Sequence, residues 1–243
     1  MEADLWIVGF CQSQTVLRGC VATLSNSEVE RAVRFATAQL RSRFAFNRGV
    51  LRYILSRYTD ATPALLRFAS GLHGKPFLPC STVNFNVSHS GDYLACAVTR
   101  DVPVGIDIER IRDIPELFAI ARGHFSPREC EQLEALPASY LTRGFFECWT
   151  RKEAFVKATG LGLSQGLDHF EVTSGPGSGS SEAWGIHPLD LAYSYCGAFA
   201  AEARNISFTY YRLRRLDIEQ IVSSQVSVPP LNTRQAGLLK SFV

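Results

Sequence analysis

Three short stretches of alternating apolar residues follow one another closely, and they limit the fold of this chain more than any other feature. Their ranges are 83–88, 93–99 and 104–109, and the joints between them are Ser90-Gly91-Asp92 and Arg100-Asp101. Joints this short are typical of tight turns between antiparallel strands. The region therefore predicts successive hairpins and excludes an all-helical chain.

Helical spacing of apolar residues flanks these strands on both sides. A helix is expected to begin near Ser27, and residues 31–58 continue the pattern with Gly49 as the expected break. Ser126 has the sequence context of a helix N-cap, and a further helix is expected over 139–158, ending at Gly160. Other strands are expected at 5–10, 169–172 and 206–213. Helices mixed with hairpins predict an α+β fold.

The composition is that of an ordinary globular protein. The 243 residues are 46% hydrophobic and 20% charged, with a net charge of +2 that is too small to indicate nucleic-acid binding. The sequence has no apolar run of membrane-spanning length and no signal-peptide pattern. It contains seven cysteines, none of which form a C-x-x-C pair. We therefore expect a cytoplasmic protein with reduced thiols and no membrane association. Residues 174–181 indicate a Gly/Ser linker or hairpin loop, and residues after about 224 lack periodicity.

Two carboxylates alternate with aliphatic residues in the strand expected at 104–109. A period of two places Asp107 and Glu109 on one face and the aliphatic side chains on the other. Residues two apart on a strand are about 7 Å apart at Cα, so both carboxylates can reach one cation. The alternative is an ordinary polar face exposed to solvent.

The helix expected at 139–158 carries a third carboxylate. Trp149, Glu153 and Lys157 are four residues apart and share one stripe of that helix, with Lys152 next to Glu153. The alternative is a Glu–Lys pair on a wet surface, and such a pair adds only a few tenths of a kcal/mol.

Several basic side chains indicate an anion-binding site. Residues 31–58 contain seven arginines and no acid, which fits either a solvated helix face or a surface for anions. His89 ends a strand just before a glycine turn, and Lys75 precedes a proline in an exposed loop. Carboxylates for a hard cation and basic groups for phosphates together predict a magnesium-dependent reaction on a polyphosphate ester.

Three sequence blocks resemble the 4′-phosphopantetheinyl transferases of the Sfp type. The blocks are "GKPFLP" at 74–79, "FNVSHSG" at 85–91, and "GIDIE" at 105–109 joined to "FSPRE" at 125–129 and "WTRKEAFVKATGLGL" at 149–163. Their order and spacing also fit the family. The arginine-rich segment matches the family only in outline, at residues 34–35 and Arg43.

This resemblance implies a fold and an activity. The fold would be two similar α/β subdomains related by a pseudo-twofold axis, spanning 1–103 and 104–223, with the site in the cleft between them and a tail at 224–243. The activity would be magnesium-dependent transfer of the phosphopantetheine arm from coenzyme A to a serine of an apo acyl or peptidyl carrier protein, releasing 3′,5′-ADP. A monomer is expected, because one chain supplies both subdomains.

The resemblance also assigns residues. Asp107, Glu109 and Glu153 match the magnesium ligands. The residues matched to coenzyme A binding are Arg43, Lys75, Pro76, Ser88, His89, Lys152 and Lys157. In catalysis, Glu153 or a water on the metal would accept the serine proton and Lys157 would stabilise the leaving group, with Asp107 and His89 also at the reacting centre.

Three other functions could use these residues or, for RNA binding, the arginine-rich helix and its aromatic residues. A metal-dependent phosphoesterase would replace the carrier serine with water and would need a second metal site. A non-catalytic module that binds coenzyme A or a carrier would tolerate loss of Glu109 or Glu153. An RNA-binding domain is disfavoured by the balanced charge and by the lack of a recognisable RNA-binding motif.

Overall fold

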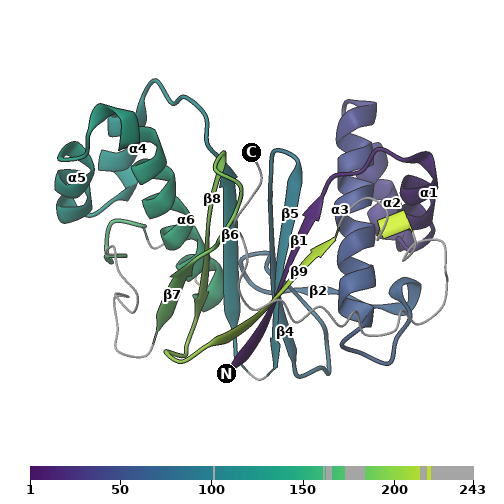
Figure 1. Cartoon of the computed structure of the whole chain (residues 1–243). Coiled ribbons are helices and arrows are strands. Elements are labelled where there is room, and N and C mark those ends of the chain that lie inside the picture. The colour runs from purple at the N-terminus through teal and green to yellow at the C-terminus, as the bar shows by residue number, and fades with distance from the viewer. Residues whose placement is uncertain (101, 161, 163–165, 173–183, 214–217, 220–243) are drawn as a thin grey trace.

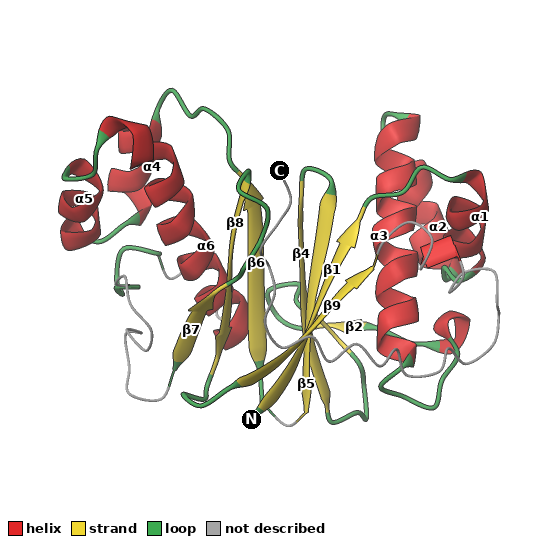
Figure 2. Cartoon of the chain, in the orientation of Figure 1, coloured by secondary structure: helices red, strands yellow, loops and turns green. Residues whose placement is uncertain are grey.

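The computed structural model describes residues 1–100, 102–160, 162, 166–172, 184–213 and 218–219. Two sheets lie face to face in the middle of the molecule, with helices on the outer side of each (Figures 1 and 2). One apolar cluster joins the two sheets through residues such as Leu5, Ile7, Ile106 and Phe199. The predicted α+β class is confirmed, and the pseudo-twofold relation and the division at residue 103 stay predictions.

The first sheet has the strand order β4-β5-β1-β9. Its strands are β1 (Glu2–Gly9), β4 (Val83–Ser90), β5 (Tyr93–Arg100) and β9 (Ser207–Leu213). The hairpin predicted around Gly91 is confirmed, because β4 and β5 pair antiparallel and Gly91 has a φ of 54°. Strand β9 pairs with β1 in parallel, so the chain returns to the first sheet after building the second.

The second sheet has the strand order β6-β8-β7. Its strands are β6 (Val104–Arg110), β7 (Gly185–Pro188) and β8 (Tyr195–Ala201). The prediction that β6 forms a hairpin with β5 is wrong. Both edges of β5 are already occupied by β4 and β1, so β6 has no free edge to pair with and joins β8 instead.

Three helices cover the outer face of the first sheet: α1 (Gln14–Ala22), α2 (Asn26–Val33) and α3 (Ala38–Ser56). Helix α2 begins with a capping box between Ser25 and Glu28. The expected break at Gly49 is wrong, since the break falls between α2 and α3 and Gly49 lies inside α3. A Cβ at Gly49 would lie 2.4 Å from the Cβ of Cys20, so the missing side chain lets α1 and α3 pack closely.

The second sheet is covered by α4 (Leu117–His124), α5 (Pro127–Glu134) and α6 (Leu141–Thr159). The N-cap predicted at Ser126 is confirmed, and α6 ends as predicted at Gly160, which has a left-handed φ of 71°. Short elements complete the described chain: 3-10 helices at Pro63–Leu65 and Ala138–Tyr140, and a small ribbon of β2 (Ala69–Ser70) and β3 (Pro76–Phe77).

The prediction of a strand at 169–172 is wrong. Residues 167–170 form bends and a turn. The polar backbone groups of this segment are bound by side chains: Lys152 donates to the carbonyls of Leu167 and Phe170, and Glu129 accepts from the N–H of Val172. A segment satisfied in this way needs no strand partner.

Two other expectations lie outside the described residues, namely the linker at 174–181 and the tail after 224. Across the described ranges, no helix combines the length and apolar character needed to cross a bilayer.

Candidate functional site

Strand β6 places its two carboxylates against helix α6. Val104, Ile106 and Ile108 pack into the cluster between the sheets, so the alternate positions face the helix, as the period of two predicts. A Cβ at Gly105 would lie only 1.9 Å from the carbonyl oxygen of Ala154. The bare backbone at Gly105 therefore lets α6 lie directly on the strand, which brings Glu153 and Lys157 to the carboxylates.

Asp107 is buried and joined to two side chains. Lys157 Nζ donates to its Oδ1 over 2.6 Å, and the Ser88 hydroxyl donates to the same oxygen over 2.8 Å. The other oxygen, Oδ2, is buried and has no hydrogen-bond partner among the described residues. Burial raises the pKa of Asp107, and the ion pair with Lys157 opposes that rise.

Glu109 and Glu153 belong to the same electrostatic cluster. Burial is the main cause that raises the pKa of Glu109, with a further contribution from the charge of Asp107, and a hydrogen bond from Ser90 over 2.6 Å acts in the opposite direction. Burial also raises the pKa of Glu153. The charge of Lys157 lowers this pKa, whereas the charges of Asp107 and Glu109 raise it further. Three carboxylates therefore share one region with one ammonium group.

These residues fit a magnesium ion bound together with a phosphate ester. Within the described ranges, no three His, Cys, Asp or Glu side chains form a ready cage for a metal, and Lys157 is bound to one oxygen of Asp107. Magnesium, however, usually binds through one or two carboxylates, several waters and the phosphates of a substrate. The free Oδ2 of Asp107 and the mutual repulsion of the carboxylates suit that mode of binding.

Not every aromatic or basic residue on α6 joins the site. Trp149 packs edge-on against His124, with ring centroids 5.5 Å apart, and so belongs to the apolar cluster under α4. Lys152 is fully buried, where it pairs with Glu129 over 2.7 Å and donates to two backbone carbonyls. These three bonds use every N–H donor of Lys152 and hold the segment 167–170, which is a structural role that the sequence did not reveal.

Lys75 also has a role that the sequence did not reveal. Its ammonium donates to the carbonyls of Val104 and Lys157 over 2.8 and 2.6 Å, with a longer contact to that of Ala158. Lys75 thereby ties a loop of the first half of the chain to the start of β6 and the C-terminal end of α6. Burial lowers the pKa of this lysine to about 8.

The expected contacts to coenzyme A lie on strand β4 and nearby. His89 is exposed, and alternation along the strand directs it to the face opposite Ser88. Arg43 lies beside the β4–β5 turn, where it pairs with Asp92 over 2.8 Å, donates to the carbonyl of Gly91 and stacks on Phe10. Lys157 faces the carboxylates, where its ammonium pairs with Asp107 over 2.6 Å.

The arginine-rich segment is only partly available to anions. Arg52 is buried and bound to Glu28 over 2.6 Å, and Arg48 also pairs with Glu28. Arg52 further donates to the carbonyls of Pro63 and Leu66. These two arginines connect α2, α3 and the following loop, whereas those at positions 31, 34 and 41 are exposed.

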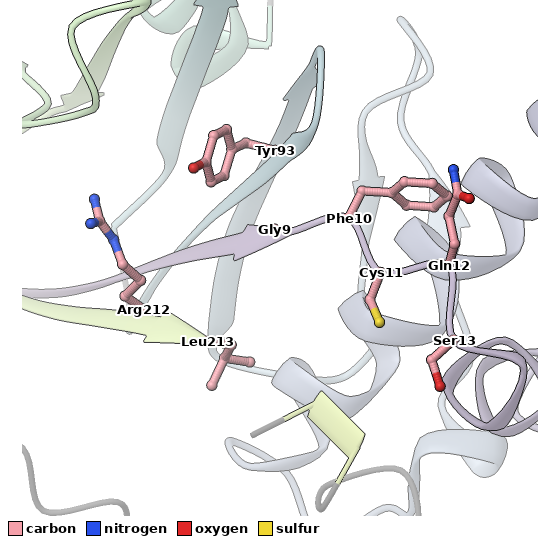
Figure 3. A pocket seen from close by; sticks show the side chains of 8 residues that line it. All are labelled: Gly9, Phe10, Cys11, Gln12, Ser13, Tyr93, Arg212 and Leu213. Carbon is pink, nitrogen blue, oxygen red and sulfur yellow. The ribbon is translucent and has the colours of Figure 1, made fainter. Parts of the chain in front are cut away.

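Two pockets lie near these residues. A pocket of about 180 Å³ lies at the start of β4, where Lys75, Pro76, Phe77 and Phe85 are among the lining residues. A larger hollow of about 520 Å³ lies at the C-terminal end of β1, lined by residues 9–13 together with Tyr93, Arg212 and Leu213 (Figure 3). The sequence did not indicate this second hollow, which depends on strand β9 returning to β1.

Both halves of the chain match models of known protein families. Residues 103–206 match the family model of the 4′-phosphopantetheinyl transferase superfamily, and residues 12–101 match a model described as 4′-phosphopantetheinyl transferase, N-terminal. The three carboxylates and Lys157 lie within the first of these matches.

Individual relatives carry the same name. The chain is 38% identical over 179 residues to the 4′-phosphopantetheinyl transferase HetI of Nostoc sp., covering 72% of this chain and 75% of that protein. It is 34% identical over 150 residues to the 4′-phosphopantetheinyl transferase Sfp of Bacillus subtilis, covering 61% and 66%. A phosphopantetheinyl transferase of Thraustochytrium sp. is 29% identical over 237 residues, covering 91% of this chain and 76% of that protein. Like these relatives, the chain belongs to the 4′-phosphopantetheinyl transferase superfamily.

Proposed function

We propose that this enzyme transfers the 4′-phosphopantetheine arm of coenzyme A to a serine of an apo acyl or peptidyl carrier protein, in a magnesium-dependent reaction that releases 3′,5′-ADP. The observation that carries the proposal is the cluster of Asp107, Glu109, Glu153 and Lys157, in which a buried oxygen of Asp107 has no partner among the described residues. Family membership supplies the substrate class.

Coenzyme A is proposed to lie along strand β4. The adenine ring suits the pocket at Pro76 and Phe85, and the diphosphate suits the other end of the strand, next to Lys157. At the usual rise of a strand, Phe85 and His89 are about 13 Å apart, a length that a nucleoside diphosphate can span. His89 and Arg43 would then contact phosphate oxygens as exposed or half-exposed basic groups.

Asp107, Glu109 and Glu153 would hold the magnesium ion, which when bound neutralises charge on the diphosphate. The carrier serine oxygen attacks the phosphorus of the phosphopantetheine group, a new P–O bond forms, and the bond from that phosphorus to the ADP oxygen breaks. Glu153 accepts the serine proton, a role suited to a carboxylate whose pKa is raised by burial. Lys157 stabilises the charge that develops on the departing ADP, so positioning and electrostatics supply most of the rate.

Intact-mass spectrometry of apo acyl and peptidyl carrier proteins tests the transfer. We expect the carrier to gain the mass of one phosphopantetheine arm with coenzyme A and Mg²⁺, and to gain nothing with EDTA or with Glu153→Gln. Glu147→Gln is the matched control, because Glu147 lies on the same helix but pairs with Arg143 away from the carboxylates. No mass gain on any carrier, with coenzyme A binding intact by calorimetry, would contradict the transferase activity.

We also propose a cytoplasmic monomer. All seven cysteines are unpaired, as in a reducing compartment, and one chain supplies both β4 and β6. Sedimentation analysis tests the oligomeric state, and a single species at dimer mass would contradict it.

A further inference from the structure

Strands β4 and β6 are the facing edges of the two sheets, yet they are joined by side chains rather than by backbone pairing. The N–H groups of Ile106, Ile108 and Arg110 point away from β8. They donate in turn to Asn86 Oδ1 over 2.9 Å, Ser88 Oγ over 3.3 Å and Ser90 Oγ over 3.0 Å. Both sets of residues advance by two, so the strands run in the same direction. We call these three side chains the β4 ladder.

Each member of the β4 ladder suits the residue it faces. Ser88 and Ser90 also donate to the carboxylates of Asp107 and Glu109, over 2.8 and 2.6 Å. A hydroxyl has one proton to donate and two lone pairs to accept, so each serine can serve a carboxylate and a backbone N–H at once. Asn86 lies beside Gly105, where no carboxylate needs a donor.

The outer end of the β4 ladder differs from the buried end. Asn86 is buried, so loss of its oxygen would leave the N–H of Ile106 without a partner in the core. Ser90 is only half-buried and the N–H of Arg110 is near solvent, so water can replace the hydroxyl there. At Glu109 the hydroxyl has a further role, because Ser90 is the only described side chain that donates a hydrogen bond to this carboxylate and so fixes its orientation.

We propose that Ser90 is a positioning residue for phosphopantetheinyl transfer: it holds Glu109 in the orientation in which that carboxylate serves the reacting centre. The proposal rests on the function proposed above. It also gives the two serines of "SHS" separate roles, since Ser90 acts on Glu109 and Ser88 on Asp107. His89 lies between the two serines and points to the other face of β4. One strand therefore carries both the expected phosphate contact, His89, and the two serines that bind the carboxylates.

Three variants test the proposal: Ser90→Ala, Ser90→Thr, which keeps the hydroxyl, and Asn86→Ala. For Ser90→Ala we expect kcat to fall roughly tenfold or more, as for loss of a hydrogen bond to a charged group, with KM for coenzyme A unchanged. Calorimetry of the enzyme–coenzyme A complex should show weaker Mg²⁺ binding. The melting temperature should stay close to that of the wild type, Ser90→Thr should recover both kcat and Mg²⁺ affinity, and Asn86→Ala should lower the melting temperature.

Ser56→Ala is the matched control, because the hydroxyl of Ser56 donates only to the carbonyl of Tyr53 at the end of α3. Wild-type kcat and Mg²⁺ affinity in Ser90→Ala would overturn the proposal, and so would a melting temperature lowered as far as in Asn86→Ala. If the wild type and Ser56→Ala modify no carrier, the proposed function itself fails, and this result is distinct from loss in Ser90→Ala alone.

Discussion

Lys157 Nζ lies 2.6 Å from Oδ1 of Asp107, and this ion pair joins the helix of the second sheet to the strand that carries the carboxylates. Asp107 is buried, whereas the side chain of Lys157 keeps 29% of its exposure. The lysine can therefore leave the carboxylate when another cation arrives, without itself being trapped in the interior. This partial exposure suits the proposed role, in which Lys157 would pair with a diphosphate once magnesium is bound.

Removing this lysine should destabilise the protein. Lys157→Met leaves the charge of Asp107 buried without its cationic partner. Such a change lowers the free energy of unfolding by about 3–5 kcal/mol when the pair is fully buried. We expect about 1–3 kcal/mol here, because Lys157 is partly exposed. Urea denaturation measures the loss. The double variant Asp107→Asn with Lys157→Met should recover much of the stability and none of the activity, and equal losses in the single and double variants would contradict the coupling.

Magnesium should stabilise the protein more at pH 8 than at pH 5. The folded-state pKa values of Asp107, Glu109 and Glu153 are raised above their unfolded values. The cost of ionising these buried carboxylates in the fold is therefore absent below the unfolded pKa values, grows as pH rises, and is complete above the folded pKa values. Melting curves with Mg²⁺ and coenzyme A should show a rise of several degrees at pH 8 and a smaller one at pH 5. An equal rise at both pH values would show that the carboxylates do not bind the ion.

Lys75 should contribute to stability through its three carbonyl contacts. Lys75→Met removes donors from the carbonyls of Val104, Lys157 and Ala158, and we expect a loss of about 1–3 kcal/mol. The pKa of Lys75 is about 8 in the fold, below its ordinary value, so between pH 8 and 10.5 the unfolded chain binds the proton more tightly. The stability of the wild type relative to Lys75→Met should therefore rise with pH across this interval, as chemical denaturation at several pH values would show.

Lys152 should prove structural. Lys152→Met leaves Glu129 buried without its cation, and we expect a loss of about 3–5 kcal/mol in urea denaturation. The affinity of the folded fraction for coenzyme A, measured by calorimetry, should be unchanged. Arg151→Met is a suitable control, because it removes a neighbouring cation from the same helix. A weakened affinity with normal stability would instead assign Lys152 to the coenzyme site.

The sequence predicted features that depend on neighbours in the chain. Alternation in 104–109 predicted which face of β6 carries Asp107 and Glu109, and Ser126 and Gly160 predicted helix ends, because period and capping are local properties. The pairing of β6 was not predictable in the same way. It depends on both edges of β5 being taken by β1 and β4, and that is a property of the whole sheet.

The roles of the basic residues show the same limit. In sequence, Lys75, Lys152 and Arg52 are simply cations, and a motif match assigns the two lysines to coenzyme A binding. In the structure their partners are carbonyls and carboxylates contributed by distant segments, such as Glu28 for Arg52 and Glu129 for Lys152. Helix α1 and strands β7 and β8 were missed because they are short or, in β8, uniformly buried and without alternation.

Strand β9 makes the first sheet a composite of both ends of the described chain. It pairs with β1 along seven residues, and the N–H of Ser207 donates to the carbonyl of Met1. A polypeptide cut after residue 103 would therefore carry an uncovered β1 edge, which invites association with other strands. The two halves of the chain are thus not separable modules, because the second half contributes strand β9 to the sheet of the first. If the halves were expressed separately, this strand would have to be supplied in trans.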